Sequence, residues 1–147
     1  MELVFFFLVL VAGMLAPAQA GINAELSRHL HSNFLAALVS FCVGTAALLL
    51  YSLALRLPWP PVSALARAPW WVWIGGLCGA YLVTVTITAA PRLGATAMFG
   101  AFLTGQLLAS LALDHFGLFG YPEHPISGWR LLGVALLFAG VFLVRKF

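Results

Sequence analysis

The chain has 147 residues, of which 63% are apolar and only 7% carry a charged side chain, and its mean hydropathy is +1.06. Such a composition excludes a soluble domain with a charged surface, so lipid is the expected solvent. The net charge of +3 comes from basic residues that are scattered singly, apart from Arg145 and Lys146, and this pattern does not indicate nucleic-acid binding.

Five apolar runs of roughly bilayer-spanning length follow one another along the chain. A helix needs about 20 mostly apolar residues to cross the hydrocarbon layer, and the alternation typical of membrane β-strands is absent. We therefore predict an all-α integral membrane protein with five transmembrane helices in a single membrane domain, residues 1–147. The predicted spans are residues 3–23, 33–55, 70–89, 94–113 and 129–144, of which the last is the shortest.

The connections between the runs carry the residues that end helices. Residues 56–69 contain four prolines, and residues 114–128 hold several glycines and prolines. The link at residues 90–92 is so short that the third and fourth helices are predicted to form an antiparallel hairpin. In the first run, Ala18-Gln-Ala20 matches a signal-peptide cleavage pattern, but no basic residue precedes it, which favours a retained membrane anchor.

Five spans would place the two termini on opposite sides of the membrane. Three basic residues then lie on the side of the N-terminus and four on the other side, so the positive-inside rule gives almost no bias. Either weak cues set one orientation with the C-terminal pair inside, or the chain inserts both ways and pairs antiparallel. The first group is Arg56, Arg67 and Arg130, and the second is Arg28, Arg92, Arg145 and Lys146.

Tryptophan and cysteine positions have ordinary explanations. The tryptophans gather near the N-terminal side, which is typical of an interfacial belt, with ligand stacking by Trp70 or Trp73 as the alternative. Cys42 and Cys78 lie in different spans without CxxC spacing and are predicted to be free thiols that act as small apolar fillers.

Small residues recur every four positions in several runs, a spacing that lets helix backbones approach closely. This pattern predicts a compact bundle rather than a wide pore. The stripes are Ala36, Ser40 and Gly44; Ala97, Ala101, Gly105 and Ala109; and the pair Gly75 and Gly79.

Polar side chains inside apolar runs are the candidate solute contacts, because each needs a partner or water. Serine and threonine usually bond back to their own helix. Gln106 sits deep in its run, and bonds to its own helix cannot satisfy all the polar atoms of its carboxamide. It therefore either hydrogen-bonds to a neighbouring helix or contacts a ligand. The candidate substrate-binding residues are Gln19 and Asn23 in the first run, Tyr81 and Thr84 in the third, and Gln106 and Ser110 in the fourth.

No acidic or basic residue lies in the middle of a run. The candidates for ion coupling are therefore Glu25, Asp114 and His115, all near helix ends. The simpler expectation is that Glu25 pairs with Arg28 or His29 and that Asp114 pairs with an arginine nearby.

Nothing in the sequence indicates catalysis. The four histidines fall in two pairs on opposite sides of the predicted membrane, so one protomer cannot gather them around a metal ion. No HExxH, GxSxG, Cys/His cluster or phosphate-binding loop is present. We predict no enzyme activity, no cofactor and no metal site.

Several segments in this order and spacing resemble the YdcZ-like family of the drug/metabolite transporter superfamily, over essentially the whole chain. The resemblance implies a bacterial inner-membrane protein equivalent to half of a ten-helix inverted-repeat transporter. It also implies a partner of opposite orientation, either a second copy or a sister five-helix chain. The segments are residues 19–26, 37–45, 90–95, 105–110, 114–117 and 133–140.

Two functions remain open from the sequence. The first is a dimeric transporter in which two inverted protomers move a small organic solute by alternating access. A neutral, zwitterionic or amphipathic solute fits the absence of mid-span charge better than a strong cation. The second is a non-transporting membrane subunit or assembly protein in which the polar residues are packing contacts only.

Overall fold

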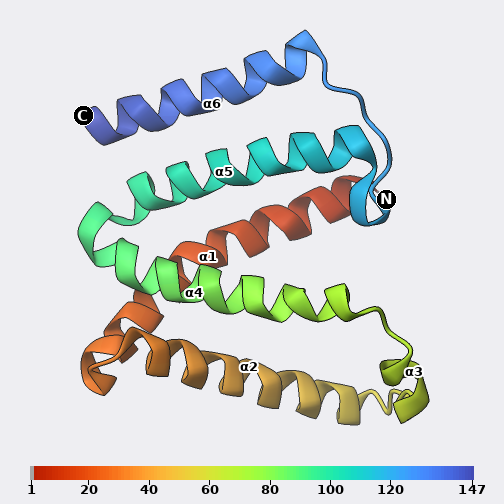
Figure 1. The fold of residues 1–147 in the computed structure, drawn as a ribbon. Helices are drawn as coiled ribbons and strands as arrows, with labels where there is room; N and C mark the ends of the chain where they lie inside the picture. The colour runs from red at the N-terminus through yellow and green to blue at the C-terminus, as the bar shows by residue number, and fades with distance from the viewer. Residues whose placement is uncertain (1) are drawn as a thin grey trace. The chain divides into compact units, whose positions relative to one another are not determined.

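The computed structural model describes residues 2–147 and is helical throughout its regular structure (Figure 1). Four helices are long and apolar enough to cross a membrane, and the C-terminal helix is apolar but shorter. The all-α prediction is confirmed at this level. The elements are α1 (Glu2–Leu30), α2 (Asn33–Ala54), α3 (Val62–Ala66), η1 (Trp70–Trp73), α4 (Ile74–Leu93), α5 (Ala95–Phe116), η2 (Leu118–Gly120) and α6 (Gly128–Lys146).

The chain divides into two compact units. Unit 1, Met1–Pro91, contains α1, α2, the short helices α3 and η1, and nearly all of α4. Unit 2, Arg92–Phe147, contains α5, η2 and α6.

In unit 1, α1 is longer than the sequence predicted. It continues past residue 23 to Leu30, because the residues that follow form helix readily and Arg28 and His29 lie in the last turn, where basic side chains favour the helix dipole. Pro17 lies inside α1, and a proline there removes one backbone hydrogen bond and bends a helix. The chain then reverses at His31, which has a positive φ, and Ser32 caps α2 by accepting from the Leu35 N–H.

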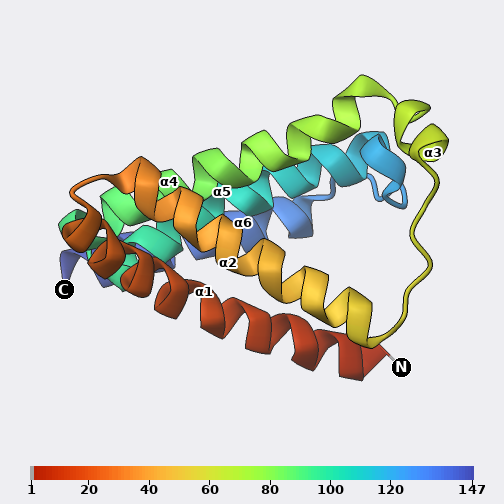
Figure 2. The same ribbon diagram turned by 90° about the horizontal axis from the view of Figure 1, so that it is seen from below.

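Helices α1 and α2 run antiparallel and pack together at this reversal (Figure 2). The core of unit 1 is Ala36, Ala37 and Ile87, with Ile87 only 1% exposed. Leu26, Leu30 and Val83 pack against it from α1 and α4. The two alanines let the larger side chains of the neighbouring helices come close to α2.

The proline-rich connection and the end of α4 differ from the predicted boundaries. Residues 56–69 are not wholly irregular, because they include the one-turn helix α3. Helix α4 includes Pro91 and ends at Leu93, so the predicted break at residues 90–92 is wrong. The break occurs at Gly94, whose φ of 75° lies in the left-handed region that glycine tolerates.

In unit 2, α5 and α6 lie side by side and antiparallel (Figure 1). They approach closely at Gly100, where an added Cβ would lie 2.9 Å from a methyl carbon of Val141. Helix α5 ends at Phe116, and Gly117 caps it in the left-handed conformation with φ 58°. After η2, an extended segment leads to Ser127, which caps α6 by accepting from the Arg130 N–H.

Candidate functional site

Asn23 is the most unusual polar residue of unit 1. Only 4% of it is exposed, and its neighbours Ala20 and Ala24 on the same face of α1 are buried as well. Its side chain has no hydrogen-bond partner among residues 2–147. A carboxamide carries two N–H donors and an acceptor oxygen, and leaving them unused in an apolar setting costs about 2–7 kcal/mol. Asn23 is therefore a group that needs a partner from elsewhere.

One turn further along α1, a chain of hydrogen bonds joins three helices. The Ser27 hydroxyl on α1 donates to Asn33 Oδ1 on α2. Asn33 Nδ2 donates over 2.9 Å to the Thr88 hydroxyl on α4, and Thr88 donates over 2.8 Å to the Thr84 carbonyl oxygen. We call this set, Ser27, Asn33, Thr88 and the Thr84 carbonyl, the Asn33 bridge.

Asn33 was missed by the sequence analysis. It directly follows the cap residue of α2 and reads as part of a helix start, so nothing local signals that it reaches two other helices. Its amide accepts a hydrogen bond at one atom and donates from another, which lets Asn33 join both neighbouring helices. A weak signal was available, since Ser27 lies one turn after Asn23 on α1 and Thr88 lies one turn after Thr84 on α4.

The other candidates of unit 1 contribute no side chain to this cluster. Gln19 is exposed, although its spacing of four residues from Asn23 places both on one face of α1, and Tyr81 is 75% exposed. The Thr84 hydroxyl donates to the Ala80 carbonyl oxygen over 2.8 Å, as expected for a threonine that bonds back to its own helix. Roles for these three residues in solute binding stay predictions.

In unit 2, Gln106 and Ser110 are exposed side chains of α5 with no hydrogen bond among the described residues. Gln106 lies near the middle of the candidate span Ala95–Phe116. Its carboxamide therefore needs a partner from outside unit 2 if α5 is surrounded by lipid. Thr104, which is buried, differs because it donates to the Gly100 carbonyl oxygen over 2.9 Å.

The charged candidates form ion pairs with neighbours. Glu25 accepts from the Arg28 guanidinium over 2.8 Å and lies 3.6 Å from His29 Nε2, and all three side chains are exposed. Asp114 Oδ2 lies 2.9 Å from an Arg130 nitrogen, with both side chains half-buried. Both pairings predicted from the sequence are confirmed, and ion coupling at these residues stays a prediction.

Arg130 does more than pair with Asp114. Its second guanidinium nitrogen donates to the His124 carbonyl oxygen over 2.9 Å, and the His124 N–H donates to the Asp114 carbonyl oxygen over 2.8 Å. The third candidate, His115, accepts from the Ile126 N–H at Nδ1 over 3.3 Å. These bonds hold the loop after α5 against the helix end.

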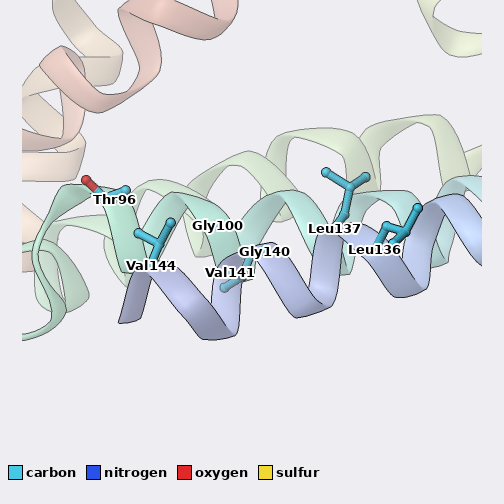
Figure 3. A pocket seen from close by; sticks show the side chains of 7 residues that line it. All are labelled: Thr96, Gly100, Leu136, Leu137, Gly140, Val141 and Val144. Carbon is cyan, nitrogen blue, oxygen red and sulfur yellow. The ribbon is translucent and has the colours of Figure 1, made fainter. Parts of the chain in front are cut away.

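Two apolar hollows flank the contact between α5 and α6. One has a volume of about 350 Å³ and is shown in Figure 3. The other, of about 380 Å³, is lined partly by Ala97, Ala101 and Gly105, so this stripe of small residues faces an open hollow rather than the close contact at Gly100. The first hollow is lined by Thr96, Gly100, Leu136, Leu137, Gly140, Val141 and Val144.

The remaining small residues and the cysteines only partly match expectation. Within the described residues, nothing lies within 4 Å of a Cβ built on Gly44 or Gly75, while a Cβ on Gly79 would make ordinary contact with Phe41 at 3.5 Å. Cys42 and Cys78 are free, as predicted, but both are exposed, so their predicted role as packing fillers is wrong within the protomer.

Comparison with known proteins identifies the family. The model of the DMT_YdcZ family, described as "Putative inner membrane exporter, YdcZ", matches residues 4–143. No curated protein and no solved structure shows significant similarity to the chain. The description is that of an exporter and not of an enzyme, and the inner-membrane location that it gives agrees with the four long apolar helices. The chain belongs to the YdcZ family, whose description is that of an inner-membrane exporter.

Proposed function

We propose that the chain is one half of an alternating-access exporter for a small organic solute. It has five spans, α6 being the fifth, and pairs with a second copy or a sister chain of opposite orientation. The observation that carries the proposal is that two carboxamides inside candidate spans, Asn23 and Gln106, have no hydrogen-bond partner in the described protomer. In hydrocarbon such groups require a partner.

Asn23 supports the solute-binding half of the proposal. It is buried together with the small residues Ala20 and Ala24 of the same helix. Among the described residues, no fully enclosed side-chain nitrogen or oxygen lacks a hydrogen bond, so the unpaired Asn23 amide is not completely enclosed. A solute that carries a donor and an acceptor would satisfy it.

Gln106 supports the pairing half. It is exposed mid-span on α5 together with Ser110, one turn nearer the helix end. A second chain, or another part of this chain, would supply the missing bonds in the membrane. The near-equal count of three and four basic residues on the two predicted sides is compatible with opposite orientations of two otherwise identical chains.

The solute class follows from the charges. The charged side chains of Glu25, Asp114 and Arg130 are engaged in ion pairs near helix ends. An uncharged, zwitterionic or amphipathic solute would therefore meet carboxamides and hydroxyls within the spans rather than a compensating charge.

The test is efflux from cells that lack their other major exporters. The chain would be expressed alone, and accumulation would be measured for a panel of neutral, zwitterionic and cationic organic compounds. For each compound exported, Asn23→Leu should reduce efflux at least tenfold while the purified protein keeps its oligomeric state. Ser52→Ala is the matched control, because the Ser52 hydroxyl bonds only to the Leu48 carbonyl oxygen of its own helix.

The alternative of a non-transporting subunit predicts a different pattern. In that case no compound is exported, and Gln106→Leu dissociates the assembly without any specific effect of Asn23→Leu. Loss of efflux only in proportion to the loss of folded protein would also contradict the transporter proposal.

The antiparallel arrangement has its own test. A reporter fused to the C-terminus should be found on both sides of the membrane, and two lysines added after Phe147 should restrict it to one side and reduce assembly of the lone chain. A wild-type reporter on one side only, together with a parallel purified dimer, would exclude this arrangement.

A further inference from the structure

The Asn33 bridge lies between the aqueous end of unit 1 and Asn23. Ser27 is four residues beyond Asn23 on α1, so the two share a face, and Ser27 is one turn nearer the turn at residues 31–32. That turn carries the exposed His31 and follows the exposed pair Glu25 and Arg28. A solute that reaches Asn23 from this end must pass the level of the bridge.

The bridge also lies at the most closely packed end of unit 1. Every described buried residue of this unit lies at the level of the bridge or within about two turns of it along its helix. The opposite ends of the same helices are exposed throughout, over residues 3–15 of α1, 41–51 of α2 and 69–78 in and before α4. The buried residues are Ala20, Asn23, Ala24, Ala36, Ala37, Thr86 and Ile87.

The bonds of the bridge suit a contact that forms and breaks. All its members are neutral, and a neutral hydrogen bond contributes little net free energy because water or a solute can replace the partner. The core around Ala36 and Ala37 begins one turn further along α2, so the bridge lies at the edge of the apolar contacts and not within them. An ion pair at this position would cost far more to separate.

We propose that Asn33 is a gate residue of the exporter. Its carboxamide holds α1 and α4 onto α2 at the most closely packed end, and its hydrogen bonds break when the path from that aqueous side to Asn23 opens. This inference rests on the proposed transport function, but it concerns a residue and a step that the solute contacts do not define.

The test measures access to the buried face without any solute. Ala24→Cys, beside Asn23, is introduced on a Cys42→Ala, Cys78→Ala background, and the protein is placed in lipid nanodiscs with both faces accessible. The probe is a charged methanethiosulfonate reagent that does not enter lipid. Ala24 is 8% exposed, so labelling should be slow. Adding Asn33→Leu should raise the labelling rate at least tenfold, and adding Thr88→Val should raise it severalfold.

Two controls separate gating from damage. Thr88→Ser keeps the hydroxyl that accepts from Asn33 and should keep labelling slow, and Ser52→Ala, whose hydroxyl lies outside the bridge, should have no effect. Hydrogen exchange of the Asn33→Leu protein, with its cysteines intact, should accelerate over residues 20–37 and not over α5. Unchanged labelling, or exchange that accelerates equally in α5, would overturn the proposal.

The two proposals can fail separately. If labelling is unaffected by Asn33→Leu while Asn23→Leu still abolishes efflux, the protein is an exporter without this gate. If labelling responds as expected while no compound is exported, the bridge closes unit 1 but the transport function is wrong.

Discussion

The helices inside unit 1 and the helices inside unit 2 are joined by different kinds of contact. In unit 1, helices meet through the neutral Asn33 bridge and a small core around Ile87. In unit 2, α5 and α6 meet through a glycine contact at Gly100 and, at their ends, through the Asp114–Arg130 ion pair. The bridge joins carboxamide and hydroxyl groups, whereas the ion pair lies beside an exposed loop.

This difference follows from the solvent that each contact meets. A charge is expensive inside hydrocarbon, so a polar link within spans is best built from neutral groups. At the membrane surface water solvates a charged pair, which then contributes little to stability but can tie a loop to a helix end. The comparison predicts that the contacts respond differently to substitution and to salt.

The largest effect is expected where two helices touch with no space between them. Gly100→Leu places a side chain where even a Cβ would lie 2.9 Å from Val141, so the α5–α6 pair must separate. The free energy of unfolding should fall by about 3 kcal/mol, measured by denaturation in mixed micelles. Gly133→Leu on α6 is the matched control, because nothing lies within 4 Å of its Cβ position, and it should be close to neutral.

A smaller effect is expected at the Asn33 bridge. Asn33→Leu removes the bonds to Ser27 and Thr88, which should lower the free energy of unfolding by about 1–2 kcal/mol. Because no charge is involved, the loss should be the same at 0.1 M and at 1 M salt, by the same denaturation measurement. A loss that shrinks at high salt would mean that the bridge depends on a charged group.

The smallest effect is expected at the ion pair of unit 2. Asp114→Asn removes the charge but keeps an acceptor for Arg130, and the cost should be at most about 1 kcal/mol. Screening should abolish most of it at 1 M salt, where the Debye length is about 3 Å. Hydrogen exchange at the amides of His124 and Ile126 should report the loosened loop. A salt-independent loss would contradict the contrast between the two units.

The broad architecture was predictable from the sequence because it depends on lengths and composition. Long apolar runs, proline-rich connections and charges at the ends of the runs follow from the cost of exposing backbone and charged groups to lipid. The same local logic predicted the pairing of Glu25 with Arg28 or His29, since residues three or four apart on a helix are neighbours. The path of α4 through Pro91 was missed, because a proline near a helix end reads as a stop.

Contacts between residues far apart in the sequence were decided only by the tertiary structure. Asn33 and Thr88 are 55 positions apart, and neither carries a local signal that it bonds to the other. Gln19 and Asn23 fit one helical face by spacing, yet one is exposed and the other buried, because burial depends on which neighbouring helix covers that face. The apolar runs therefore identified the candidate polar residues of the spans, and their spacing assigned them to helix faces. The packing of α1, α2 and α4 determined which of these residues have partners.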